Sequence, residues 1–208
     1  MKLESPRIPE DLTEYTFLPD EDEYENCLFD GVDMTGEALR SREFRNCVFR
    51  RCTLADADLT RAGFVDVHFD HCDLSRCVLE HAVLQRVQLD ACRLTGTEMV
   101  GAILRSTTMR DCKADYLNLS EAKVNHSRFT GCILREAAIE QVALSSALFD
   151  DCDLTRATLF RTPLKGVDLR TCTLDGLLVN LPDLRGMIVT HLQAAELARL
   201  LGLIVKEG

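Results

Sequence analysis

Residues 152–156 read CDLTR, and close variants of this pentapeptide occur at 72–76 (CDLSR) and 57–61 (ADLTR). In each, a small residue and a central leucine flank one acidic residue, and two further residues follow. Counting outward from these stretches in steps of five, the central position is apolar at every step from Tyr24 to Leu184. No insertion or deletion interrupts the series. The chain is therefore built on a five-residue repeat.

All ten cysteines fall in one register of this repeat, two residues before a centre. Seven of them recur every 20 residues, from Cys52 to Cys172. Five phenylalanine centres fall on the same 20-residue spacing: Phe29, Phe49, Phe69, Phe129 and Phe149. This longer period indicates that four pentapeptides make one coil.

A period of five matches neither an α-helix, with 3.6 residues per turn, nor a continuous strand, with a period of 2.0. Two inward residues separated by one outward residue form a short extended segment, and the remaining two residues turn the chain. About eight coils at a spacing of ~4.8 Å predict a rod about 38 Å long. We expect reduced thiols inside it, because stacked sulfurs about 5 Å apart are too distant for a ~2.05 Å disulfide bond.

These pentapeptides resemble the A(D/N)LXX unit of the pentapeptide-repeat proteins. The resemblance covers residues 24–184 and implies an all-β fold, a right-handed quadrilateral parallel β-helix whose centres stack along its axis. We therefore expect three regions: an acidic N-terminal tail or cap over 1–23, the β-helix over 24–184, and a capping and dimerisation element over 185–208.

Two places in the register are irregular. Glu37 and Arg42 occupy inward positions of the first coil, where we expect an ion pair or a loosened coil, since an unpaired buried charge is costly. Ala114 is a small centre, and Leu117, on the adjacent side, is large at a position that is usually small. We expect the Leu117 side chain to fill the space that Ala114 leaves.

The sequence departs from the repeat after Leu184. Thr190 and Gln193 form a capping-box pattern that predicts a helix, which Gly202 should end before a short strand over 203–206. In topoisomerase-binding members of the family such a helix and strand mediate a dimer. The resemblance implies the same role here for Leu197, Leu200, Leu201, Leu203, Ile204 and Val205. A monomeric cap over the last coil is the alternative.

The formal net charge of −10 argues against direct binding to nucleic acid, because phosphate contacts require a basic surface. Nine acidic residues lie among the first 26, which does not fit the basic start of a secretory signal. No run of 18 apolar residues predicts a membrane span. With reduced cysteines, we predict a cytoplasmic protein without membrane contact.

Residues 68–72 read HFDHC, which combines residue types that bind zinc. His68 and His71 should point outward while Cys72 points inward, so we expect no metal site there, and no cofactor elsewhere. The other acids are spread over a convex shaft, whereas acid–base catalysis needs a water-excluding cleft. We expect a protein without enzymatic activity.

The unbroken register resembles the loopless, mycobacterial type of the Qnr-like fluoroquinolone-resistance proteins. This resemblance implies a homodimer that mimics duplex DNA and binds DNA gyrase, a type II topoisomerase, with fluoroquinolone resistance or self-protection as the outcome. The acids expected to meet this partner lie on two adjacent sides: Asp70, Asp73, Asp90, Asp111, Asp115, Asp150, Asp151 and Asp153. The side centred on Phe44 and Phe64 is almost bare of acids after Asp66. A mixed-charge interaction scaffold with another protein partner explains the same pattern.

Overall fold

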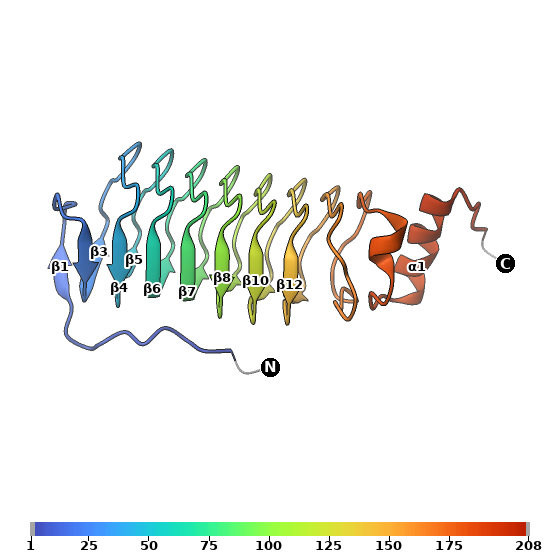
Figure 1. Cartoon of the computed structure of the whole chain (residues 1–208), viewed down its shortest axis with the longest axis horizontal. Helices are drawn as coiled ribbons and strands as arrows, with labels where there is room; N and C mark the ends of the chain where they lie inside the picture. The colour runs from blue at the N-terminus through green and yellow to red at the C-terminus, as the bar shows by residue number, and fades with distance from the viewer. Residues whose placement is uncertain (1–2, 207–208) are drawn as a thin grey trace.

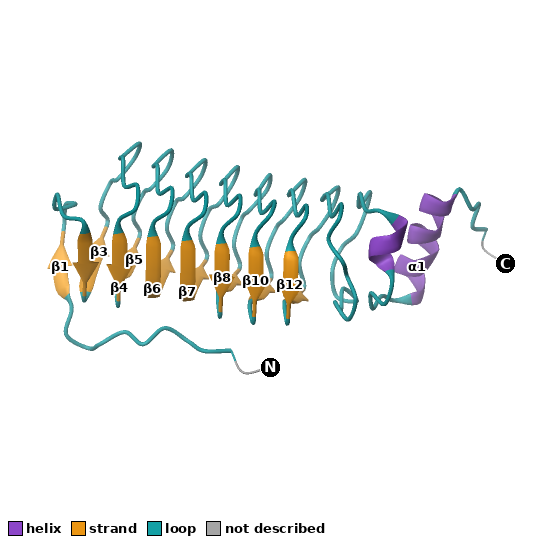
Figure 2. Ribbon diagram, in the orientation of Figure 1, coloured by secondary structure: helices purple, strands orange, loops and turns teal. Residues whose placement is uncertain are grey.

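The computed structural model describes residues 3–206 and shows a four-sided rod of stacked coils, with its helices gathered at the C-terminal end (Figures 1 and 2). This is the predicted right-handed parallel β-helix. From Glu23 onward, the strands pair in parallel with the residue 20 positions further along, as Phe44 does with Phe64 and Phe49 with Phe69. The predicted 20-residue coil is therefore confirmed.

Thirteen described strands form two of the four sides. They are β1 (Thr13–Tyr15), β2 (Glu23–Glu25), β3 (Cys27–Asp30), β4 (Glu43–Arg45), β5 (Val48–Arg50), β6 (Gly63–Asp70), β7 (Val83–Asp90), β8 (Ile103–Arg105), β9 (Thr108–Arg110), β10 (Lys123–Asn125), β11 (Arg128–Thr130), β12 (Ala143–Ser145) and β13 (Leu148–Asp150). Single bridges join the coils on the other two sides, and one series of them runs through eight rungs from Asp33 to Thr173.

The four sides are named here by what marks them. The phenylalanine side has the centres Phe29, Phe49, Phe69, Leu89, Met109, Phe129 and Phe149. The cysteine side follows it along the chain and places the thiols of Cys52 to Cys172 beside centres such as Leu54. The fourth side has centres such as Leu59 and Leu119, and the tail side has Tyr24, Phe44, Phe64, Leu84, Leu104, Val124 and Leu144.

One residue in five turns each corner of the rod. From Asn26 to Gly166 every fifth residue has a positive φ, between 48° and 78°. This left-handed conformation costs most residues about 1 to 2 kcal/mol and is least costly for Gly, Asn and Asp. The corner N–H groups bond the next coil, as Asp56 N–H does with the Ser75 carbonyl oxygen at 3.0 Å. Hydrogen bonds between coils therefore hold most of the corners.

The centres form a continuous buried core. On the phenylalanine side the Phe29 and Phe49 rings stack with centroids 4.9 Å apart, and those of Phe49 and Phe69 with centroids 4.7 Å apart. Ala114 and Leu117 are both completely buried, so Leu117 does point inward as predicted. The large centres and small flanking residues fill the interior in alternation.

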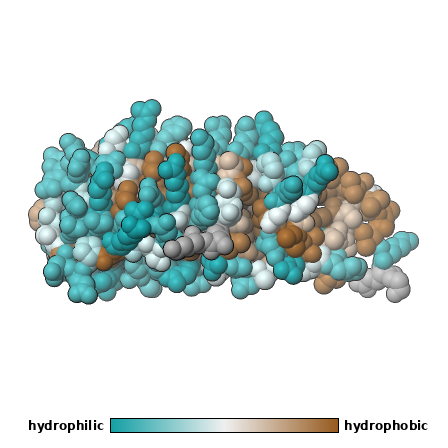
Figure 3. Space-filling model, turned by 60° about the horizontal axis from the view of Figure 1, so that its bottom comes forward, coloured by the Kyte–Doolittle hydropathy of each residue, from teal (hydrophilic) through white to brown (hydrophobic). Residues whose placement is uncertain are grey.

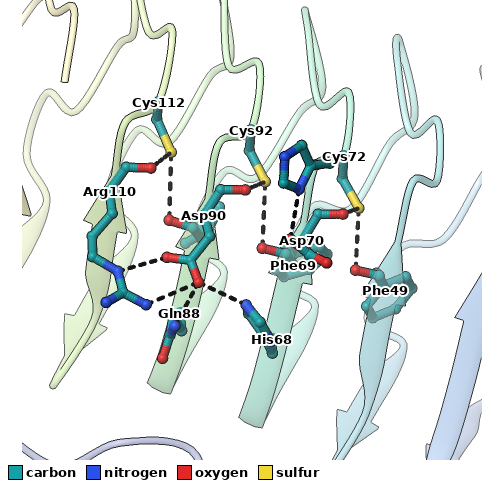
Figure 4. Close-up of polar contacts among 12 residues, drawn as sticks. Phe49, His68, Phe69, Asp70, Cys72, Gln88, Asp90, Cys92, Arg110 and Cys112 are labelled. Atoms are coloured by element: carbon teal, nitrogen blue, oxygen red, sulfur yellow. Dashed lines mark hydrogen bonds and ion pairs between the residues drawn. The ribbon is translucent and has the colours of Figure 1, made fainter. Parts of the chain in front are cut away.

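All ten cysteines are buried and free, which fits the expected reduced thiols. On the cysteine side each thiol meets a backbone carbonyl of the preceding coil, as Cys72 Sγ does with the Phe49 oxygen at 3.3 Å. Figure 4 shows three successive thiols in this arrangement. Burial raises the pKa of Cys47 and of Cys77 to about 12. These thiols therefore act as core residues and as weak donors that satisfy carbonyl oxygens.

The N-terminal end corrects one prediction. Glu37 is exposed, and Arg42 pairs with Asp20 and Asp22 of the acidic tail rather than with Glu37. The first coil keeps its regular backbone hydrogen bonds around both residues. The predicted ion pair or loosened coil is wrong because no earlier coil covers Glu37 and Arg42, so Glu37 reaches water and Arg42 reaches the carboxylates of the tail.

The C-terminal end carries the 3₁₀-helices η1 (Leu181–Leu184) and η2 (Ala198–Leu201) and the helix α1 (His191–Leu197). The predicted capping box is present, and Gly202 ends the helical segment at a φ of 74°. Residues 203–206 do not form the predicted strand, because they leave the rod and have no strand to pair with among the described residues. No described helix is long and apolar enough to cross a membrane.

Candidate protein-interaction surfaces

The eight acids predicted to meet a partner lie on the phenylalanine and cysteine sides, as the register requires. Three neighbouring side chains contact Asp90 (Figure 4). Its carboxylate lies 2.9 Å from His68 Nε2 and accepts hydrogen bonds from Gln88 Nε2 at 2.5 Å and Arg110 Nε at 2.8 Å. Partial burial raises the pKa of Asp90, but the bonds from Arg110, Gln88 and His68 outweigh it and leave the pKa below its usual value.

Four further acids of the predicted set also have a basic partner within the chain. These are Asp70 with His71 at 2.7 Å, Asp73 with Arg93 at 3.2 Å, Asp150 with Arg128 at 4.0 Å, and Asp153 with Arg135 at 2.6 Å. Each pairing with an arginine reduces the negative potential that an acid presents to a partner. The surface thus carries a ladder of alternating charges rather than rows of free carboxylates.

Most of these pairs join residues about one coil apart. Asp56 and Arg76 are 20 residues apart in the chain and bond through both carboxylate oxygens, at 2.7 and 2.6 Å. Asp66 and Arg86 do the same and are the most buried pair on the surface. The sequence does carry a signal for these pairs, namely opposite charges 20 residues apart, but the side on which an acid lies does not reveal it.

Asp111, Asp115 and Asp151 make no ion pair among the described residues. Asp111 and Asp151 turn the same corner, between the phenylalanine and cysteine sides, two coils apart. Gly131 turns the corner between them, and a side chain there would meet the Asp111 carboxylate, since a Cβ would lie 2.5 Å from Oδ1. Asp115 lies on the cysteine side, in the same coil as Asp111. These three acids, here called the acidic corner after Asp111 and Asp151, are the unneutralised part of the predicted partner surface.

The C-terminal end presents a large apolar surface, seen as the brown region in Figure 3. Of the six residues predicted for dimerisation, Ile204 is 86% exposed and Leu201 is 60% exposed, and Leu200, Leu203 and Val205 are also exposed. Leu197 differs, because it is half-buried and packs against the core of the rod. A shallow groove beside them is lined by Leu181, Leu184, Met187, Val189, Ala194, Leu197, Ala198 and Leu201.

The HFDHC stretch has the orientation expected for it. His68 and His71 lie outside and contact Asp90 and Asp70, while Cys72 lies in the core. Among residues 3–206, no group of three or more His, Cys, Asp or Glu side chains is arranged to hold a metal ion.

Family models match two parts of the coil. The model described as "Pentapeptide repeat region" matches residues 82–159, and the model described as "Pentapeptide repeats (8 copies)" matches residues 43–76. A comparison with curated protein sequences gave no match.

Solved structures with the same repeat are similar at low identity. Full-length QnrB1, a plasmid-mediated fluoroquinolone-resistance protein, is 17% identical over 87% of this chain and 100% of its own, with a TM-score of 0.39. HetL, a pentapeptide-repeat protein involved in heterocyst differentiation regulation in the cyanobacterium Nostoc sp. strain PCC 7120, is 19% identical over 84% of this chain and 92% of its own, with a TM-score of 0.36.

Proposed function

Because this chain belongs to the pentapeptide-repeat family, we propose that it is a non-enzymatic binding protein that presents its acidic sides to DNA gyrase as a mimic of duplex DNA. The observation that supports this proposal most directly is the acidic corner. Asp111 and Asp151 are exposed and Asp115 is half-buried, and none of the three makes an ion pair among the described residues, whereas the other five predicted acids each have a partner. Exposed charge of one sign raises the rate of encounter with a basic partner.

The shape of the rod also suits this role. Its coils are stacked without an inserted loop, so outward residues recur at the strand spacing of ~4.8 Å along a straight axis. The apolar C-terminal end is suited to pairing two copies, because such surfaces on soluble proteins commonly mark interaction sites. Two rods joined there would approach about 75 Å in length, long enough to lie along a DNA-binding channel.

A second candidate function is that of an interaction scaffold for another protein partner. The observation that favours it is the internal pairing of five of the eight predicted acids. A surface whose acids are paired in this way has a weaker negative potential, whereas a mimic of DNA phosphates needs a strongly negative one.

A supercoiling titration distinguishes the two. Purified protein is added to gyrase in increasing molar excess, and we expect inhibition that weakens as salt screens the exposed charges. The triple variant Asp111→Lys, Asp115→Lys, Asp151→Lys should lose most of the inhibition. Because exposed charges contribute little to stability, its circular dichroism spectrum should match that of the wild type.

The matched control reverses three acids that also make no ion pair among the described residues, Glu80 and Glu140 on the fourth side and Glu121 at its corner with the tail side, each to Lys. It has the same net charge as the triple variant and should retain inhibition. If a large excess of the wild-type protein does not change the supercoiling activity of gyrase, DNA mimicry is excluded and the scaffold function remains. If gyrase is inhibited, expression in bacteria followed by measurement of fluoroquinolone susceptibility tests the resistance outcome.

A further inference from the structure

The tail side carries a strip of spaced positive charges. Its outward positions from Val83 to Gly166 include no acidic residue. Arg86 at the start of this stretch is paired with Asp66. The cations that follow along the tail side are exposed and make no ion pair among the described residues; they are Arg105, Lys123, Lys165 and, beyond the stretch, Arg185. We call these four residues the basic strip.

This strip departs from the charge pattern of the other sides. On the phenylalanine and cysteine sides, arginines such as Arg93 and Arg110 find a carboxylate one coil away. On the tail side the residue one coil before Lys123 is Ile103, and the residue one coil after it is Ala143. Within residues 3–206, these positive charges therefore have no partner to neutralise them.

The acidic N-terminal tail already lies in line with the strip. Residues 3–12 fold back beneath the coils and run toward the middle of the rod (Figure 1). The Arg7 N–H donates a hydrogen bond of 3.0 Å to Asp66 Oδ1, at the corner between the tail and phenylalanine sides. Asp66 raises the pKa of Arg86 most, and Glu4 of the tail raises it further. The tail has an extended conformation, and its apolar side chains are half-buried: Leu3, Pro6, Ile8 and Leu12.

From these observations we propose that the basic strip is a docking surface for an extended acidic peptide segment of a partner protein. The segment would continue along the line that the tail follows. The three coils from Arg105 to Lys165 span about 14 Å at ~4.8 Å per coil, which an extended peptide of four to five residues matches at ~3.3 Å per residue. The tail shows that an acidic, extended chain fits against the rod at Asp66 and Arg86, next to the start of the strip.

A peptide fits the strip better than a nucleic acid does. The strip is one side wide, and acids lie beyond both of its edges, including Glu121 at one corner and Asp150 on the phenylalanine side. A wider polyanion would meet these carboxylates, and the protein as a whole carries a net charge of −10. Binding of single-stranded DNA in preference to the acidic peptide would therefore contradict the proposal.

The test is fluorescence anisotropy with the full-length protein. The probe is a labelled peptide with the sequence of residues 3–14, LESPRIPEDLTE, and its partner probe has Gln and Asn in place of Glu and Asp. We expect the acidic probe to bind and the neutral one to bind much more weakly. The double variant Arg105→Gln, Lys123→Gln should bind the acidic probe roughly five-fold more weakly, from two exposed charge pairs.

The control variant Lys113→Gln, Arg199→Gln removes two cations that make no ion pair among the described residues and lie away from the strip. It should bind the acidic probe as the wild type does. Equal binding by the two double variants, equal binding of the two probes, or preference for a 12-nucleotide DNA strand over the acidic probe would each overturn the proposal. Circular dichroism confirms that both variants are folded. None of these outcomes depends on gyrase, because the acidic corner is unchanged in every variant.

Discussion

Replacing Leu117 with alanine tests whether the Leu117 side chain fills the space left by Ala114, the small centre of the core. Leu117 and Ala114 are completely buried and lie on adjacent sides of the same coil. The backbone between them is fixed, because Leu117 N–H bonds the Ala114 carbonyl oxygen at 3.2 Å and Ala138 N–H bonds the Leu117 carbonyl oxygen at 2.9 Å. The coils on either side hold small residues in the register of Leu117, namely Thr97 and Ala137.

The expected loss follows from these contacts. Leu117→Ala removes three buried carbons, worth about 2.4 kcal/mol at ~0.8 kcal/mol each. The coil cannot collapse into the space, because hydrogen bonds tie it to both neighbours, so a cavity remains and raises the total to about 3 to 4 kcal/mol. With an m-value of about 2 kcal/mol per molar, the urea midpoint should fall by roughly 1.5 to 2 M.

Urea unfolding followed by circular dichroism measures this loss, and a swap of the two residues sharpens it. Ala114→Leu alone should overpack the core and cost about 1 to 3 kcal/mol. The double variant Ala114→Leu, Leu117→Ala restores a large centre beside a small residue, and should recover much of the stability. Leu178→Ala, at a residue 48% exposed, is the control and should cost under about 1 kcal/mol. A loss below about 1 kcal/mol for Leu117→Ala, or additive losses in the double variant, would refute the reasoning.

Three further outcomes are expected. Burial raises the pKa of Asp66, but hydrogen bonds from the Arg86 side chain and the Arg7 N–H outweigh burial and lower the pKa in the folded protein. The ionised Asp66 therefore stabilises the fold at pH values above its unfolded pKa of about 4. This stabilisation is lost as the pH falls through the lower pKa of the folded state. Asp66→Asn should therefore destabilise the protein near pH 7 and reduce the loss of stability on acidification, measured by urea unfolding across pH. The ten buried thiols should resist a thiol reagent at pH 8 and react when urea unfolds the rod, which absorbance titration follows; rapid reaction of the native protein would contradict their burial. If the apolar C-terminal end forms a dimer, the wild-type protein should sediment as a dimer and the Ile204→Glu variant as a monomer in sedimentation velocity. The same monomer mass for both proteins would indicate a monomeric cap.

The interior of the rod was predictable because one rule applies to every coil. An apolar centre every five residues fixed which side chains point inward, and the 20-residue recurrence of Cys52 to Cys172 fixed the number of sides. The capping box at Thr190 and Gln193 was predictable for a similar reason, since its two hydrogen bonds are local.

The ends were less predictable because the five-residue rule holds only where a neighbouring coil covers the inward positions, and at each end one neighbour is missing. Arg42 occupies an inward position but reaches the carboxylates of Asp20 and Asp22, since no earlier coil closes over it. Residues 203–206 have an apolar, strand-like composition but no strand beside them. The course of the tail along the rod, tied by Arg7 to Asp66, joins residues 59 positions apart and has no periodic signal.

The single corner residue in each pentapeptide determines what deletions can do to this protein. Removing 20 residues, for example 93–112, would join Cys92 to Lys113 in the same register and shorten the rod by about 4.8 Å. Removing only five would rotate everything beyond the cut by a quarter turn, so that Asp151 would move from its line with Asp111 to the neighbouring corner while the core stayed apolar. A deletion of 20 residues therefore changes the length of the rod, whereas a deletion of five residues changes the direction in which the surface beyond the cut faces.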